Sequence, residues 1–90
     1  MGAVILSGYV LTTKPDLPKI LAALPEHIRL TRAEPGCIVF SVTQDDDNPL
    51  RFDVYEEFES KEDFAKHQAR IVGTNWSEAS KSLEKFYEIS

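Results

Sequence analysis

Apolar positions follow a strand period at the start of the chain and change to a helix period near residue 17. Residues 3–12 are rich in aliphatic and aromatic side chains, and both alternating sets of positions are largely apolar. One set is Val4, Leu6 and Val10, and the other is Ile5, Tyr9 and Leu11. A strand with two apolar sides is covered on both faces of its sheet, so residues 3–12 predict such a strand.

The helix period begins after a turn at residues 13–16, where Asp16 is the predicted N-cap. One apolar stripe then recurs at helical spacing, formed by Leu17, Ile20, Leu21, Leu24 and Ile28. Pro25 removes one backbone donor within this stretch, which predicts a kink. The helix should end before Pro35, because the residue ahead of a proline avoids helical angles.

Two further strands are predicted on either side of a polar turn. Residues 37–44 alternate around Ile38, Phe40 and Val42, and residues 50–58 return with Phe52, Val54 and Phe58 on one side and Tyr55 on the other. Residues 45–49 contain three aspartates and an Asn-Pro pair, which is typical of a hairpin loop. The two strands should therefore pair antiparallel.

The last third of the chain predicts a helix, a short helical turn and a strand. Ser60 and Asp63 resemble a capping box, and Gly73 fits a helix stop. The helical face between them carries Phe64, His67, Gln68, Ile71 and Val72. Residues 76–82 could form one more helical turn, and residues 84–89 are a final strand.

The predicted order β-α-β-β-α-β is that of a ferredoxin-like α+β fold, and residues 1–90 form one domain. A four-stranded antiparallel sheet with both helices on one face leaves its other face bare. Because the first strand is apolar on both sides, we expect that bare face to be covered, most economically by a second copy of the chain. The sequence thus predicts a two-fold homodimer.

Composition narrows the classes of partner. The chain has a net charge of −5 and no basic stripe, which argues against nucleic acid or an anionic membrane surface. The apolar N-terminus has no basic region or cleavage site of a signal peptide, and no run reaches the length of a membrane span. We therefore expect a cytoplasmic protein in which the single cysteine, Cys37, is a reduced thiol.

Several of these residues together match a known pattern. Glu34-Pro35-Gly36-Cys37, then Phe40, the Asp/Asn/Pro turn, Tyr55-Glu56-Glu57-Phe58 and His67 make the chain resemble the antibiotic biosynthesis monooxygenase domain family over nearly its whole length. The resemblance implies a small dimeric α+β barrel. It also implies an oxygenase of the quinol type that works without a cofactor.

Two titratable residues are candidates for catalysis. His67 lies on the apolar stripe of its helix and could accept or donate a proton in a ligand pocket, or hold the helix end by a hydrogen bond. Glu56 lies in mid-strand, where a carboxylate needs a partner. It could orient His67 or hold a substrate hydroxyl, but an interface or helix-capping salt bridge with Arg29, Arg32 or Arg51 is the favoured interpretation.

Five aromatic residues are candidates for substrate binding, although they could equally be ordinary core: Trp76, Phe64, Phe40, Tyr9 and Tyr55. His27 lies one position off the apolar stripe and is expected to face solvent. Cys37 is expected to be a packed small residue and not a nucleophile. No zinc spacing and no dinucleotide or phosphate-binding glycine motif occurs, so neither a metal nor a cofactor is predicted.

The leading functional hypothesis is a cofactor-independent monooxygenase of a small aromatic or quinol-like molecule. The substrate, once deprotonated, would supply electrons to oxygen, and the protein would supply a dry pocket and a proton acceptor. The alternatives are an isomerase of a small hydroxy-ketone metabolite and a non-catalytic dimeric module that binds a small ligand, since one fold carries many activities.

Overall fold

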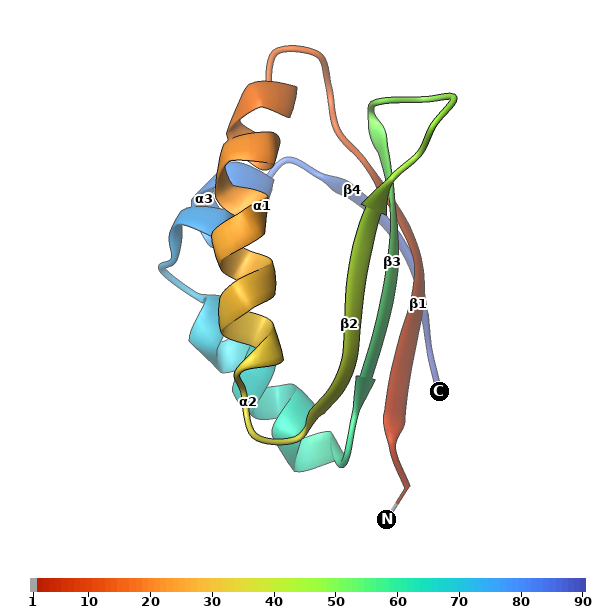
Figure 1. The fold of residues 1–90 in the computed structure, drawn as a ribbon, viewed down its shortest axis with the longest axis vertical. Helices are drawn as coiled ribbons and strands as arrows, with labels where there is room; N and C mark the ends of the chain where they lie inside the picture. The colour runs from red at the N-terminus through yellow and green to blue at the C-terminus, as the bar shows by residue number, and fades with distance from the viewer. Residues whose placement is uncertain (1) are drawn as a thin grey trace.

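The computed structural model describes residues 2–90, which form a four-stranded antiparallel sheet and three helices (Figure 1). The strands lie in the order β2-β3-β1-β4, which is the ferredoxin-like arrangement predicted from the sequence. The elements in chain order are β1 Val4–Leu11, α1 Leu17–Arg32, β2 Cys37–Gln44, β3 Arg51–Phe58, α2 Lys61–Ile71, α3 Asn75–Ser80 and β4 Glu84–Ile89.

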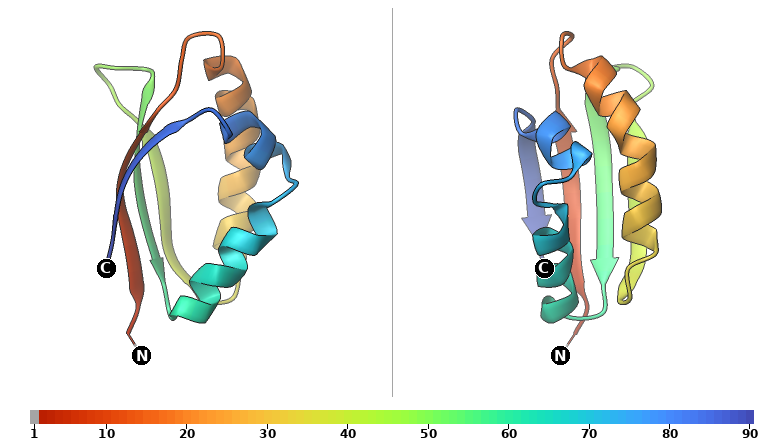
Figure 2. Two further views of the ribbon diagram at one scale, coloured as in Figure 1. Left: turned by 180° about the vertical axis from the view of Figure 1, so that it is seen from behind. Right: turned by 90° about the vertical axis from the view of Figure 1, so that its left-hand side faces the viewer.

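All three helices cover one face of the sheet, and none of the described elements covers the other face (Figure 2). The core lies between the two layers. Its buried apolar side chains come from β1, α1 and β3: Leu6, Val10, Ile20, Leu24, Phe52 and Val54. Within residues 2–90, no helix combines the length and the apolar composition that a membrane span requires.

The turns form as their residue types predict. Asp45 closes the β2–β3 hairpin loop, because its Oδ2 accepts hydrogen bonds from the backbone N–H groups of Asp47 (3.0 Å) and Asn48 (2.9 Å). At the start of α2, Ser60 Oγ accepts a hydrogen bond from the backbone N–H of Asp63 at 3.1 Å. The predicted N-cap is therefore present, but the Asp63 carboxylate accepts a hydrogen bond from the Ser60 hydroxyl at 3.0 Å and not from the Ser60 backbone N–H of a full capping box.

The two apolar sides of β1 lie on opposite faces of the sheet, as expected. Val4, Leu6 and Val10 are buried under the helices. On the opposite face, Tyr9 stacks on Phe86 of β4 with ring centroids 4.8 Å apart, and the Arg51 guanidinium lies 3.9 Å from the Tyr9 ring centre. The uncovered face, which we call the outer face, thus presents aromatic side chains without a helix over them.

Position 21 does not belong to the apolar stripe of α1 as predicted. Leu21 is 44% exposed, and the buried side of α1 instead consists of Ile20, Leu24, His27 and Thr31. These positions are separated by three or four residues and lie in one row, from which residue 21 is rotated by about 100°. The helix runs through Pro25, which lies on its exposed side.

Three other local predictions are corrected. Ile38 is 50% exposed, because the register of β2 shifts between Cys37 and Val39 and takes its side chain out of the alternation. Val72 is 77% exposed, because α2 ends at Ile71. Asp16 makes no capping hydrogen bond; its carboxylate accepts hydrogen bonds from Thr13 and Ser82 side chains instead.

Gly8 allows β1 and β4 to pair, and its substitution generates a prediction. Gly8 has φ +152°, and a Cβ there would lie 2.0 Å from the backbone oxygen of Phe86. Gly8→Ala must therefore push β4 away, and we expect thermal unfolding followed by circular dichroism to show a Tm lower by about 10 °C. Gly2→Ala, whose Cβ meets nothing within 4 Å, is the control. Equal Tm values for the two variants would contradict this packing.

Candidate active site

A cavity of about 520 Å³ lies between the helices and the sheet, and every helix and strand contributes to its wall. Most of the wall is aliphatic or aromatic. The polar groups include three titratable side chains from different elements: His27 of α1, Glu56 of β3 and His67 of α2. Lys81, Lys85 and Tyr87 also line it, and all three are exposed, so they mark its opening.

His67 is held in one orientation by the half-buried carboxylate of Glu34. The residue is 1% exposed, and its Nδ1 lies 3.1 Å from Oε1 of Glu34. A carboxylate can only accept a hydrogen bond, so Nδ1 carries the proton and Nε2 is left as an acceptor. The Glu34 carboxylate is itself held by Arg70 Nε, and Arg70 Nη2 donates to Thr31 Oγ1 at 3.0 Å.

This network was not predicted from the sequence. The sequence pattern includes Glu34 only as part of the Glu-Pro-Gly-Cys segment, and it gives no functional role to Arg70. One signal was available: His67 and Arg70 are three residues apart, so they share a helical face. The position of Glu34 opposite that face depends on how the turn after α1 meets α2, which no local pattern specifies.

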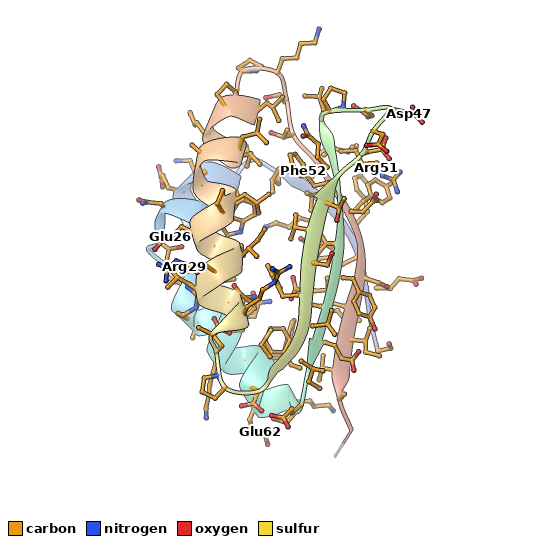
Figure 3. All side chains as sticks on the ribbon, in the orientation of Figure 1. Glu26, Arg29, Asp47, Arg51, Phe52 and Glu62 are labelled. Atoms are coloured by element: carbon orange, nitrogen blue, oxygen red, sulfur yellow. The ribbon has the colours of Figure 1, made fainter. Side chains whose placement is uncertain are left out.

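Glu56 lies beside the second nitrogen of His67. Its Oε1 is 3.9 Å from His67 Nε2, the residue is 7% exposed, and Oε1 has no hydrogen-bond partner within residues 2–90. It faces the helices because it belongs to the buried set of alternate positions in β3, together with Phe52, Val54 and Phe58. This is the same inward side as Phe52, whose ring lies between the sheet and α1 in Figure 3.

The predicted salt bridge of Glu56 with an arginine is wrong. Arg29 points away from the sheet (Figure 3) and pairs with Glu26 at 2.7 Å. The other two candidates are also engaged elsewhere: Arg51 pairs with Asp53 at 3.0 Å, and Arg32 Nε donates to the Phe40 carbonyl at 3.1 Å. All three arginines therefore leave the Glu56 carboxyl group without a cation.

Burial changes the proton affinity of both catalytic candidates. Desolvation, followed by the nearby charge of Glu34, raises the pKa of Glu56 to about 7. Desolvation lowers the pKa of His67, and the hydrogen bond and charge of Glu34 oppose that effect. Near neutral pH the site thus holds a neutral imidazole beside a carboxyl group that is poised between its two forms.

His27 is buried, so the prediction that it faces solvent is wrong. It is 5% exposed because residue 27 falls on the buried row of α1. Its ring stacks on Trp76 with centroids 4.7 Å apart and planes 7° apart, meets the edge of Phe40 at 5.3 Å, and lies 6.0 Å from the ring of His67. Burial lowers the pKa of His27 to about 3, so the ring is neutral.

The structure brings only three of the five predicted aromatic residues to the cavity. Phe40, Phe64 and Trp76 line it. Tyr9 and Tyr55 lie on the outer face, where Tyr9 stacks on Phe86 and Tyr55 donates a hydrogen bond to Glu57. The expectation that all five share one pocket is therefore corrected, and the reason is the strand alternation that sends odd-numbered residues of β1 and β3 outward.

The environment of Cys37 does not favour a nucleophile at this site. Cys37 is half-buried, and desolvation together with the carboxylates of Glu34 and Glu56 raises its thiol pKa, which disfavours a nucleophilic thiolate. Within residues 2–90, no three side chains of the metal-ligating types come together as a site. What the cavity offers is a buried proton acceptor, an ionisable carboxyl group and a mainly apolar wall.

The raised pKa of Glu56 predicts a specific dependence of stability on pH. The unfolded carboxyl ionises near 4.5 and the folded one near 7, so ionisation costs stability that is intact below pH 4.5 and lost as pH rises through 7. Glu56→Gln removes this loss. We expect its free energy of unfolding, relative to the wild type, to rise by up to about 3 kcal/mol across that range.

Urea unfolding at a series of pH values measures this difference. Groups distant from Glu56 titrate alike in both proteins, so their contribution cancels. Glu59→Gln, at an exposed position after β3, is the matched control and should show no trend. Parallel stability curves for Glu56→Gln and the wild type would contradict a folded-state pKa near 7.

Comparison with known proteins agrees with the fold. Solved structures from three organisms superpose closely on the chain. A protein from Nitrosomonas europaea, provisionally named an antibiotic biosynthesis monooxygenase, is 20% identical, with a TM-score of 0.77 over 98% of this chain and 85% of its own. One with the same provisional name from Deinococcus radiodurans is 22% identical, with a TM-score of 0.76 over 97% and 87%.

A third structure, a conserved protein from Methanosarcina mazei, is 23% identical, with a TM-score of 0.73 over 100% of this chain and 90% of its own. At these identities the likeness shows the fold alone. No curated protein sequence matches the chain. The family model described as antibiotic biosynthesis monooxygenase matches residues 4–72, which include β1 through α2 and therefore Glu34, Glu56 and His67. The chain belongs to the antibiotic biosynthesis monooxygenase family.

Proposed function

We propose that the chain is a monooxygenase that oxidises a small aromatic or quinol-like molecule without a bound cofactor. The observation that carries the proposal is the row of Glu34, His67 and Glu56, of which His67 and Glu56 line a mainly apolar cavity and Glu34 lies behind His67. The volume of about 520 Å³ is within the range of pockets that bind small molecules. The family and the names of its structural neighbours agree with this class of activity.

His67 is the proton acceptor in this proposal. Glu34 keeps the proton on Nδ1, so Nε2 can take a proton from a substrate hydroxyl that enters between it and Glu56. The imidazolium that forms lies between two carboxyl groups, Glu34 on one side and Glu56 on the other. Both can stabilise its charge, and the surrounding apolar wall strengthens that interaction because water is excluded.

The substrate anion is the reductant. A ring carbon that carries one hydrogen, next to the deprotonated ring oxygen, reacts with dioxygen, keeps one oxygen atom as a hydroxyl group and releases the other as water, so that the quinol becomes a hydroxyquinone. Two of the four electrons that reduce dioxygen come from that C–H bond and two from the oxidation of the quinol to the quinone. Two of the three hydrogens released from that carbon and the two hydroxyl groups end in the water. The protein then needs to move one proton and to exclude solvent, which are the two properties of the cavity.

Oxygen uptake with a hydroxylated aromatic probe tests the proposal. With 1,4-dihydroxynaphthalene, and after subtraction of the rate without protein, the wild type should consume oxygen, and His67→Gln should lower kcat/KM by about 10²-fold or more. Lys66→Gln, the preceding residue on the exposed side of α2, is the matched control and should retain activity. An undiminished rate in His67→Gln would remove the role of His67.

The same acid and base groups could instead isomerise a hydroxy-ketone, and a pocket that only binds would turn over nothing. Isomerisation of a hydroxy-ketone at equal rates with and without oxygen would identify the first alternative. Tight retention of the probe without any turnover would identify the second. Either result would replace the monooxygenase, because only that reaction requires oxygen as a reactant.

The proposed enzyme is a cytoplasmic homodimer whose copies pack through their outer faces. The aromatic residues there are partly exposed in a single chain: Tyr55 is 38% and Phe86 45% exposed. A small domain with a cavity in its centre has little core of its own, so burying this face would add apolar area that the chain otherwise lacks.

Sedimentation velocity tests the dimer. The wild type should sediment as a dimer at micromolar concentration, and Phe86→Glu should weaken association by about 100-fold, because it places a charge where an aromatic side chain was buried. Lys14→Glu, in the loop before α1, introduces the same negative charge away from the sheet and is the control. A wild type that sediments as a folded monomer would contradict the proposed assembly.

A further inference from the structure

Two polar groups in the wall of the cavity lack a protein partner. One is Oε1 of Glu56, which is fully buried and makes no hydrogen bond within residues 2–90. The other is the ring of His27: the residue is 5% exposed, lines the same cavity, and forms none of the side-chain hydrogen bonds of that stretch. The unpartnered oxygen of Glu56 is costly unless a ligand satisfies it, and the polar edge of His27 is free to bind a ligand in the same cavity.

The His27 ring is fixed in place by its neighbours. Trp76 covers one face with nearly parallel planes, and Phe40 contacts it at 83°. His27 occupies a position of the buried row of α1 that leucine would fill with better packing and no unsatisfied nitrogen. A ring that is clamped on an apolar surface holds its polar edge at a defined place, which is what recognition of a small molecule requires.

The chemistry of a neutral imidazole limits what His27 can recognise. Such a ring offers one N–H donor and one nitrogen acceptor, which suits a hydroxyl or a carbonyl oxygen. Its ring centre lies 6.0 Å from that of His67, so it is separate from the place between His67 and Glu56 where the proton is removed. A ring with oxygen substituents on two sides can contact both places at once.

We propose that His27 is a substrate-contacting residue that binds a second oxygen substituent of the ring. The cavity then selects flat aromatic molecules with two oxygen functions, one held between His67 and Glu56 and the other by His27. This inference rests on the proposed function for the identity of the first contact. It adds a specificity-determining residue from α1, the element in which the sequence predicted a solvent-facing histidine.

Binding under nitrogen tests the proposal separately from catalysis. Isothermal titration calorimetry of the wild type should give an affinity for 1,4-dihydroxynaphthalene about tenfold higher than for 1-naphthol, which lacks the second oxygen. His27→Phe keeps a flat ring against Trp76 but has no nitrogen. We expect it to bind the two compounds equally, with an affinity for 1-naphthol within about twofold of the wild type.

Two further variants keep the test decisive. His27→Gln retains a hydrogen-bonding side chain and should restore part of the preference, whereas His27→Leu replaces His27→Phe if the latter does not fold. A wild type that binds both compounds equally, or neither, overturns the proposal whatever the variants do. So does a tenfold preference that survives in His27→Phe or His27→Leu. A clear preference without oxygen uptake would support His27 and remove the monooxygenase.

Discussion

The structure depends on one buried interaction, the hydrogen bond between Nδ1 of His67 and the carboxylate of Glu34. It joins the turn after α1 to the middle of α2, and Arg70 and Thr31 extend it across the same junction. Withdrawing a carboxylate from water is unfavourable unless it is paired and hydrogen-bonded, and the half-buried Glu34 meets both conditions. The same contact selects the tautomer of His67, so one interaction positions two helices and also determines which nitrogen faces the cavity.

The cavity is surrounded by the side chains that fill the space between the sheet and the helices. A domain of 90 residues has a small core, and this one keeps an open volume between its layers. The side chains that surround it are mostly aromatic or β-branched, and the aromatic rings contact one another: His67 lies 4.9 Å from Phe58, which in turn meets Phe64 at 5.6 Å. These rings pack against one another and leave the space between the layers unfilled.

Sequence patterns predicted the elements well, because the signals are local. The Ser60 cap, the Asp45 turn and the alternation of β3 each depend on a few neighbouring residues and were recovered with nearly correct bounds. The errors concern where a side chain points. Leu21 and His27 exchanged their expected roles because the buried row of α1 includes a histidine, and an apolar period cannot reveal a polar residue that is buried.

The candidate site was predictable in part. His67 could be selected because it interrupts an apolar face, and Glu56 because a carboxylate in mid-strand needs a reason. Glu34 could not, since its contact spans 33 positions and depends on the packing of a turn against a helix. Tyr9 and Tyr55 look like pocket residues by type, but their position in the strand places them on the other side of the sheet.

The alternation along β4 has a consequence that extends across the sheet. Lys85 and Tyr87 border the cavity, whereas Phe86, between them, stacks on Tyr9 on the outer face. Gly8 brings the backbone of this strand close to β1, so β4 is an edge strand that is closely packed against its neighbour. A shift of this edge by a fraction of an ångström would therefore move the rim of the cavity and the aromatic side chains of the outer face together. A substitution that displaces the backbone of β4 would therefore change both the cavity and the outer face.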